Sequence, residues 1–203
     1  MYIYKGPLRL LAWEIFDRLN KEQVRCNLET GEERCIEEDV GLTACTTEMV
    51  NMEEIYDVAV LDEIQIMSAT SRGGAWTRAL LGIRAKELHL CGDESVKQLV
   101  GVLAQRCGDD IEFREYKRLC PLRVDKPLTN FTDIRKGDCI VGFSRNDIYE
   151  LKRSVESTTP FRCALVYGRL PPPNRRTQAQ LFNDQEIPYD VLIASDAIGT
   201  LQI

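Results

Sequence analysis

Apolar positions along the chain follow two alternating patterns. Short, continuous apolar runs, typical of buried parallel strands, occur at residues 2–5, 42–45, 57–61 and 87–91. Longer stretches with apolar residues three or four positions apart, typical of amphipathic helices, occur at 8–19, 75–81 and from about 94 to 106. Because strands that alternate with helices form parallel sheets with crossover helices, the pattern predicts an α/β fold.

The same alternation returns after a polar stretch. Residues 125–137 are rich in Pro, Thr, Asn and Asp, so we interpret them as a linker. Beyond them, strands are predicted at 139–143, 163–167 and 191–194, with helices at 147–155 and 175–182. The sequence therefore predicts two units, 1–124 and 138–203. Two further apolar segments, 111–116 and 122–124, precede the linker.

Composition and charge narrow the class of protein. The chain is 44% hydrophobic and 29% charged, as in ordinary globular proteins. With 26 Lys and Arg against 32 Asp and Glu, its net charge is −6, which excludes a general basic surface for nucleic acid but permits a local basic strip. The eight cysteines match neither a zinc-site spacing nor the disulfide framework of a small secreted domain. No apolar run approaches the length that a membrane span requires, and the first twenty residues lack the features of a signal peptide or a transit peptide.

The clearest candidate for chemistry follows the apolar run at 58–61. Asp62-Glu63-Ile64-Gln65 stands at the carboxyl end of a predicted strand, where open parallel sheets bind their ligands. In a Walker-B element, Asp62 would hold Mg²⁺ directly or through water, and Glu63 would orient or deprotonate the attacking water in phosphoryl transfer. An acidic pair that ends a strand also occurs as a solvated turn, and these residues alone leave both interpretations open.

Two other features bear on phosphate binding. Gly6-Pro7-Leu8-Arg9 places backbone N–H groups and a guanidinium at the start of a helix, which suits a phosphate, although a buried strand-to-helix turn has the same sequence. No Gly-x-x-x-x-Gly-Lys-Ser/Thr and no Gly-x-Gly-x-x-Gly occurs in the 203 residues. The chain therefore contains no recognisable loop for nucleotide phosphates. The single histidine, His89, is assigned no chemistry.

Together these stretches resemble the suppressor-of-Var type of superfamily 2 helicases, the RNA helicases of the mitochondrial degradosome. The resemblance covers nearly the whole chain and is carried by Gly6–Ala12, Glu14–Phe16, Thr30–Arg34, Cys45–Met49, Val60–Gln65, Ala75–Gly82, Leu88–Gly92, Phe143–Tyr149, Tyr167–Pro172, Gln178–Ala179, Phe182–Asp184 and Ala194–Gly199.

The resemblance implies two RecA-like lobes with parallel sheets, which hydrolyse ATP in the cleft between them and move along RNA, or DNA, from 3′ to 5′. The implied cofactors are ATP and Mg²⁺. By this analogy the catalytic residues are Asp62, which holds the metal, Glu63, which activates water, and Gln65. Residues that couple the nucleotide to strand movement are Gly92, Asp93, Asp196 and Gly199. Residues that line the phosphate path of the nucleic acid are Pro7, Arg9, Thr46, Ser144 and Gly168.

The resemblance also implies a location in the mitochondrial matrix, RNA that is single-stranded or has a 3′ overhang, and a partner exoribonuclease such as polynucleotide phosphorylase. Both lobes are expected to be incomplete: the first lacks the strand with the phosphate-binding loop, and the second ends before an arginine-rich motif. Because losing one preorganised donor already costs about 10²–10³ in rate, the chain by itself is expected to be inactive. The missing strand would leave an unpaired sheet edge.

Two other functions remain open from the sequence. The chain could be a non-catalytic fragment that binds RNA or a protein partner through one strand-binding face. It could also be a doubly wound domain unrelated to helicases, in which Asp62 and Glu63 form an ordinary surface turn.

Overall fold

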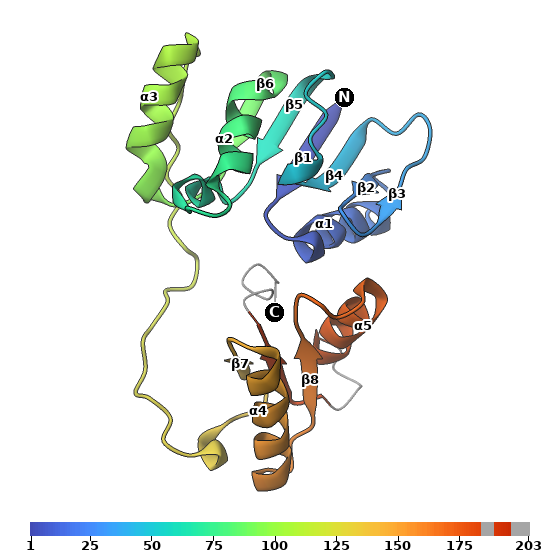
Figure 1. Ribbon diagram of the computed structural model, residues 1–203, viewed down its shortest axis with the longest axis vertical. Coiled ribbons are helices and arrows are strands. Elements are labelled where there is room, and N and C mark those ends of the chain that lie inside the picture. The colour runs from blue at the N-terminus through green and yellow to red at the C-terminus, as the bar shows by residue number, and fades with distance from the viewer. Residues whose placement is uncertain (184–188, 196–203) are drawn as a thin grey trace. The chain divides into compact units, whose positions relative to one another are not determined.

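The computed structural model describes residues 1–183 and 189–195. The chain divides into two compact units, Met1–Tyr116 and Lys117–Ile203, coloured blue to green and yellow to red in Figure 1. The division falls earlier than the expected end of the first unit at residue 124. The expected linker is also not wholly a linker, because Ile134 is buried in the core of the second unit.

The first unit contains a six-stranded sheet in the order β3-β2-β4-β1-β5-β6. The strands pair in parallel, except that β2 and β3 are antiparallel. Their bounds are Tyr2–Gly6 (β1), Asn27–Glu29 (β2), Arg34–Cys35 (β3), Leu42–Thr46 (β4), Ile55–Leu61 (β5) and Arg84–Leu90 (β6). The longer helices are Arg9–Lys21 (α1), Gly73–Gly82 (α2) and Lys97–Cys107 (α3), and short 3₁₀ helices span Thr47–Met49 (η1), Ile64–Ser68 (η2) and Glu94–Val96 (η3).

Backbone hydrogen bonds align the carboxyl ends of three strands. The amide of Asp62 donates to the carbonyl of Lys5 at 2.9 Å, which ties the residue after β5 to β1. On the other side, the amide of Cys91 donates to Leu61 at 3.0 Å, and the amide of Ile64 donates to Cys91 at 2.9 Å. The loops that follow β1, β5 and β6 therefore lie next to one another at this edge of the sheet.

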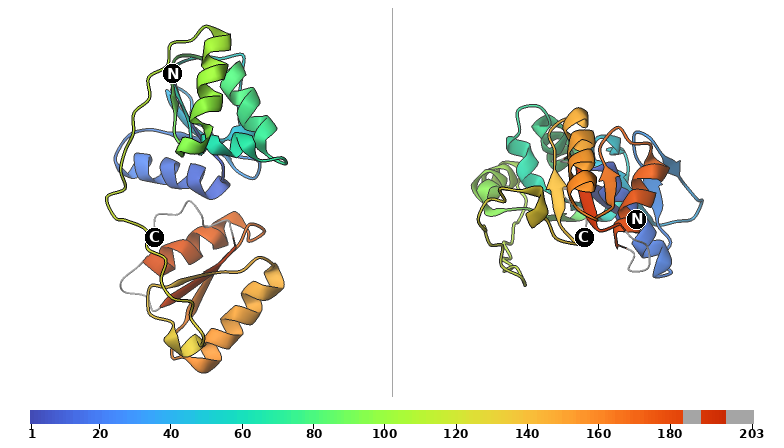
Figure 2. Two further views of the ribbon diagram at one scale, coloured as in Figure 1. Left: turned by 90° about the vertical axis from the view of Figure 1, so that its left-hand side faces the viewer. Right: turned by 90° about the horizontal axis from the view of Figure 1, so that it is seen from below.

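Both faces of the sheet receive helices. Helix α1 connects β1 to strands on one side of it, whereas α2 connects β5 to β6 in the opposite direction, so right-handed crossovers place α1 and α2 on opposite faces. Helices α2 and α3 lie side by side (Figure 2) and share a core with Leu61 and Ile64. At the centre of that core is Trp76, whose exposed fraction is 0%. Helices α2 and α3 therefore pack against the carboxyl end of β5.

Strand β6 pairs with β5 alone among the described residues, so its outer edge carries no neighbouring strand. The apolar segment 111–116 adopts no regular structure, and its Tyr116 is 85% exposed. Because a strand is stable only when a neighbour accepts its backbone hydrogen bonds, an apolar run without such a neighbour stays irregular.

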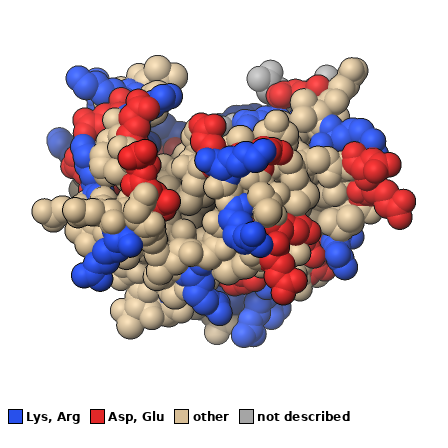
Figure 3. Space-filling model, turned by 90° about the horizontal axis from the view of Figure 1, so that it is seen from above, with Lys and Arg blue, Asp and Glu red and all other residues tan. Residues whose placement is uncertain are grey.

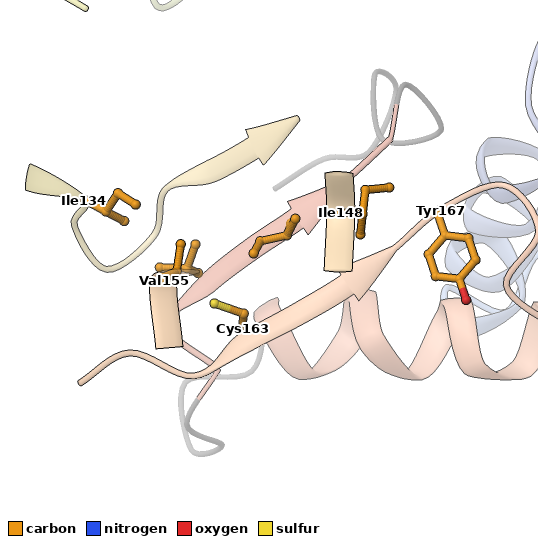
Figure 4. Close-up of a cluster of buried hydrophobic side chains, with 7 residues drawn as sticks. Ile134, Ile148, Val155, Cys163 and Tyr167 are labelled. Atoms are coloured by element: carbon orange, nitrogen blue, oxygen red, sulfur yellow. The ribbon is translucent and has the colours of Figure 1, made fainter. Parts of the chain in front are cut away.

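The second unit contains a three-stranded parallel sheet in the order β7-β9-β8. The strands are Cys139–Val141 (β7), Cys163–Val166 (β8) and Val191–Ala194 (β9), the helices are Arg145–Thr158 (α4) and Pro172–Asn183 (α5), and Phe131–Asp133 forms a 3₁₀ helix (η4). Side chains from α4, the sheet and the approach to β7 form its core (Figure 4): Ile134, Ile148, Val155, Cys163, Tyr167, Val191 and Ile193.

All eight cysteines are free, and three of them are buried. Within the part of the chain that the structure describes, no helix combines the length and apolar content that crossing a membrane requires.

Candidate functional site

The carboxylate of Asp62 is held in one orientation by its neighbours. The hydroxyl of Tyr4 donates to Oδ2 at 2.7 Å, and the amide of Glu63 donates to Oδ1 at 2.9 Å. The indole Nε1 of Trp76 donates to the backbone carbonyl of Asp62 at 2.9 Å. Both oxygens and the backbone of Asp62 are therefore fixed by groups from β1, its own loop and α2.

Glu63 adopts an unusual backbone conformation. Its φ of 53° and ψ of 45° lie in the left-handed region, which costs a residue with a side chain roughly 1–2 kcal/mol. This turn ends the strand and begins η2, and the carboxylate of Glu63 accepts a hydrogen bond from Nε2 of Gln65. Strain of this kind concentrates at functional sites, so it favours a functional origin for this turn.

Gln65 joins the loop after β5 to the loop after β6. Its Oε1 accepts a hydrogen bond of 3.3 Å from the amide of Asp93. A Cβ on Gly92 would lie 2.7 Å from Cγ2 of Ile64 and still closer to Oε1 of Gln65, so any larger residue there would force these side chains to shift. The structure thus brings together three of the residues that the sequence predicted: Gln65, Gly92 and Asp93. Asp93 also caps η3, and hydrogen bonds from Ser95 lower the pKa of its carboxyl.

The acidic pair, Asp62 and Glu63, has no ion-pair partner in the part of the chain that the structure describes. Burial, together with the hydrogen bond to Asp62, raises the pKa of Tyr4 well above its usual range. Burial also raises the pKa of Cys91, and the charges of Asp62 and Glu63 raise it further. Tyr4 and Cys91 therefore stay neutral, and the carboxylates present uncompensated negative charge.

This donor set fits a magnesium ion that is shared with a phosphate ligand. Mg²⁺ takes oxygen ligands and commonly binds proteins through one or two carboxylates plus substrate phosphates. In residues 1–183 and 189–195, no group of three or more His, Cys, Asp and Glu side chains could form a metal site by itself. Asp62 and Glu63 offer the smaller set, which suits a metal that arrives with its nucleotide.

The first-unit residues predicted to line a nucleic-acid path lie close to this edge but differ in exposure. Pro7 is buried, and its carbonyl accepts a hydrogen bond from Arg72. Arg9 is exposed and pairs with Glu32. The side chain of Thr46 is almost fully buried, with 4% exposed, because β4 lies between β2 and β1. Of the three, Arg9 presents a charged group to solvent.

The remaining predicted residues belong to the second unit. Ser144 is exposed and caps α4: its hydroxyl accepts from the amide of Asp147 at 3.2 Å, and the side chain of Asp147 accepts from the amide of Ser144. Gly168 is exposed, and its carbonyl accepts a 2.9 Å hydrogen bond from Arg175. Ser144 follows β7 and Gly168 follows β8, so both lie beyond the carboxyl ends of their strands. Asp196 and Gly199 lie outside the described residues.

Sequence reasoning missed three residues that build the site: Tyr4, Arg72 and Trp76. Each contacts Asp62 or the Pro7 loop. A signal existed for Tyr4, a polar aromatic residue in the strand that runs beside the acidic pair. For Arg72 and Trp76 the contacts depend on how the segment after η2 folds back, which no local pattern indicates.

Comparison with known proteins identifies the fold and the family. Residues 1–116 match the family model described as the DEXQ-box helicase domain of Suv3. Over 97% of its length the chain is 49% identical to the mitochondrial DExH-box ATP-dependent RNA helicase DExH18 of Arabidopsis thaliana and 47% identical to the mitochondrial ATP-dependent RNA helicase SUPV3L1 of Homo sapiens. It is 50% identical to SUV3 of Saccharomyces cerevisiae, also named mitochondrial. The chain spans about a quarter of these relatives: 26%, 26% and 27% of their lengths.

Solved structures confirm the predicted RecA-like lobes. The chain superposes on S. cerevisiae Dbp5 bound to RNA and ADP BeF3 with a TM-score of 0.67 at 14% identity, covering 98% of this chain and 58% of Dbp5. With the Mycobacterium smegmatis helicase Lhr bound to ssDNA and AMP-PNP, the TM-score is 0.68 at 12% identity, covering 98% of this chain and 34% of Lhr. The family model covers more than half of the chain and includes the Asp62-Glu63-Ile64-Gln65 segment. The chain therefore belongs to the Suv3 family of DEXQ-box helicases.

Proposed function

We propose that this chain is part of a mitochondrial ATP-dependent RNA helicase that moves from 3′ to 5′ along single-stranded RNA or RNA with a 3′ overhang. The relatives that support this proposal are named mitochondrial ATP-dependent RNA helicases and are about half identical to the chain. On the resemblance given in the sequence analysis, we further propose that it acts in the mitochondrial matrix, in RNA degradation, beside an exoribonuclease such as polynucleotide phosphorylase.

The observation that carries the enzymatic proposal is the arrangement of Asp62 and Glu63 after β5. Asp62 is fixed by Tyr4 and Trp76 and forms no ion pair with any described residue, so it is suited to hold Mg²⁺. Glu63 projects from a strained turn and would take the proton of the attacking water. When bound with ATP, Mg²⁺ would neutralise charge that develops on the phosphoryl oxygens. Gln65 hydrogen-bonds to Glu63 and to the amide of Asp93, so a movement of Glu63 would be transmitted to the Gly92–Asp93 turn.

Charge distribution supports an RNA path with few contacts. The first unit has 13 Lys and Arg against 22 Asp and Glu, whereas the second has 13 against 10. On the face drawn in Figure 3, basic and acidic side chains are interleaved. A path of this kind would depend on a few donors such as Arg9 and on backbone groups near Pro7, Thr46, Ser144 and Gly168, rather than on a broad basic surface.

The test uses the proposed full-length helicase, because this chain spans about a quarter of the relatives that it matches. Asp62→Asn and Glu63→Gln should each lower RNA-stimulated ATP hydrolysis by at least about 10²-fold, because each removes a charge that acts in the transition state. Asp57→Asn is the matched control, since Asp57 lies within β5, away from its carboxyl end, and is partly exposed and paired with Lys86. Hydrolysis at the wild-type rate in both site variants would contradict the proposal.

A second candidate is RNA binding by this chain without hydrolysis. It is favoured by two observations: the 203 residues contain no recognisable phosphate-binding loop, and the second unit carries a positive net charge. Fluorescence anisotropy with labelled oligouridylate should show binding that weakens as salt rises, because each neutralised phosphate releases counterions. If the 203-residue chain alone hydrolyses ATP as fast as the proposed full-length helicase, it is not an RNA-binding protein without activity. The same result would contradict the expectation that the chain alone is inactive.

A further inference from the structure

Arg72 contacts the loop that the proposed function assigns to RNA, and through Trp76 it is connected to the loop that the proposed function assigns to the nucleotide. Its guanidinium Nη2 donates a hydrogen bond to the carbonyl of Pro7, in the loop after β1. The same guanidinium lies over the ring of Trp76, with its carbon 5.3 Å from the ring centroid. The Nε1 of that indole donates the 2.9 Å hydrogen bond to the carbonyl of Asp62.

The elements around Arg72 hold it in this position. Arg72 immediately precedes α2, and the next residue, Gly73, packs so closely on η2 that a Cβ there would lie 2.9 Å from the carbonyl carbon of Met67. The amide of Gly73 also donates to Ala69 at 2.8 Å. Trp76, one turn further along α2, is completely buried. The start of α2 is therefore a rigid support, and the Arg72 side chain reaches from it across to the Pro7 loop.

A direct backbone link between the two loops already exists, through the amide of Asp62 and the carbonyl of Lys5. That bond lies at the end of the strand pairing and stops two residues short of Pro7. The contact made by Arg72 extends the connection to the part of the loop that precedes Arg9. It combines a charge-assisted hydrogen bond with a stacked cation, and Arg is the side chain best suited to make both at once.

We infer that Arg72 couples the Pro7–Arg9 loop to Asp62, so that the two loops open and close as one unit. The inference rests on the proposed function only for its consequence: RNA bound at the Pro7 loop would then stabilise the orientation of Asp62. Without Arg72, the Pro7 loop would loosen, and Trp76 would lose the cation that covers its ring beside the Asp62 contact. Arg72 is thus a positioning residue that acts through Pro7 and Trp76.

Hydrogen exchange of the 203-residue chain tests the link without RNA. Arg72→Ala should speed amide exchange about tenfold in two separate peptides, Lys5–Ala12 and Asp62–Ile66, while β4 stays protected. Arg78→Ala is the matched control, because Arg78 is an exposed arginine within α2 that forms no hydrogen bond or ion pair with the described residues of either loop, and it should leave both peptides unchanged. A purely local role for Arg72 would speed exchange only around residues 72–76, and that result would overturn the inference.

Trp76→Phe separates the two halves of the connection. Phenylalanine keeps an aromatic ring under the guanidinium but has no N–H to donate to Asp62. Exchange should therefore rise in Asp62–Ile66 and stay slow in Lys5–Ala12. Equal loosening of both peptides would contradict the order of contacts from Pro7 through Arg72 and Trp76 to Asp62.

The same experiment with oligouridylate distinguishes this inference from the proposed function. In the unmodified chain, RNA should slow exchange in both peptides, and in Arg72→Ala it should slow exchange in Lys5–Ala12 alone. Equal protection of Asp62–Ile66 by RNA in both proteins would overturn the role of Arg72. Failure of RNA to bind the chain at all would count against the RNA path, whereas the RNA-free exchange would still decide whether Arg72 links the loops.

Discussion

The hydroxyl of Tyr4 donates a 2.7 Å hydrogen bond to Oδ2 of Asp62, between residues that lie 58 positions apart in the chain. The bond exists because β1 and β5 are adjacent and parallel, which places Tyr4 beside the end of β5. Since burial and Asp62 raise the pKa of Tyr4 well above its usual range, the phenol keeps its proton and acts as the donor in this hydrogen bond.

Removing this hydroxyl should slow the enzyme. In the proposed full-length helicase, Tyr4→Phe leaves Asp62 without one of its two side-chain partners, and a net hydrogen bond of about 1 kcal/mol corresponds to about a fivefold lower ATP hydrolysis rate. Tyr2→Phe is the control, because Tyr2 lies on the same strand and is about half exposed. Steady-state ATPase measurements at saturating Mg²⁺ make the comparison. Equal rates for the two variants would show that Tyr4 does not position Asp62.

A side chain at position 92 should destabilise the first unit. In Gly92→Ala, the new Cβ would meet Ile64 Cγ2 at 2.7 Å and press on Oε1 of Gln65, so we expect a loss of about 1–3 kcal/mol in the free energy of unfolding. Adding Gln65→Ala should recover part of this loss. Gly74→Ala is the control, because nothing lies within 4 Å of its Cβ position. Urea denaturation provides the measurement, and equal stability of Gly92→Ala and Gly74→Ala would contradict the close packing of this turn.

The buried charge of Lys5 lowers the stability of the first unit in a pH-dependent way. Its side chain has an exposed fraction of 0%, and among the described residues no acceptor lies within hydrogen-bond distance of its Nζ. Burial lowers the pKa of Lys5 to about 8, and burial also raises the pKa of Cys45, its partner on β4, to about 12, so the thiol gives Lys5 no counter-ion. The pKa of Lys5 is lower in the folded protein than in the unfolded chain. The buried charge therefore lowers the free energy of unfolding by its full amount below pH 8, and this loss disappears as the pH rises toward 10.5.

Lys5→Met should therefore stabilise the protein near pH 7 by up to about 3 kcal/mol, because it removes the buried charge while keeping the length of the side chain. The gain should shrink as the pH is raised from 8 toward 10. Thermal and urea unfolding at several pH values measure it, with Lys21→Met, a change at a largely exposed lysine, as control. A gain that does not vary with pH would show that packing, not charge, is responsible.

Ser144 has a structural role that can be separated from an RNA contact. Ser144→Ala removes the cap of α4 and should lower the stability of the second unit by about 1 kcal/mol. Ser144→Asn keeps a capping side chain and should retain stability while removing the hydroxyl. Denaturation and oligouridylate binding are measured for both variants. If Asn restores stability and RNA binding together, the hydroxyl serves as a cap only, and the assignment of Ser144 to the RNA path fails.

The sequence predicted most strands and helices close to their observed positions. Runs such as 57–61 and 163–167 carry enough apolar residues to identify buried strands without any alignment, and the observed strands Ile55–Leu61 and Cys163–Val166 overlap them. Strands β2 and β3 were missed because they are three and two residues long and polar. Ile134 was assigned to a linker because a single apolar residue in a polar stretch gives no periodic signal, yet the core of the second unit buries it.

What the sequence determined by itself is the α/β alternation, the acidic pair that ends β5, and the resemblance that led to the Suv3 family. These properties are local, since each is written in a few consecutive residues. Tertiary structure alone decided that Tyr4 and Trp76 hold Asp62, that Arg72 joins Trp76 to Pro7, and that Gln65 meets the turn at Gly92. It also decided that Lys5 is buried with no counter-ion among the described residues. The physical reason is that these contacts depend on which strands become neighbours, and strand order is settled by packing over the whole sheet rather than by any one segment.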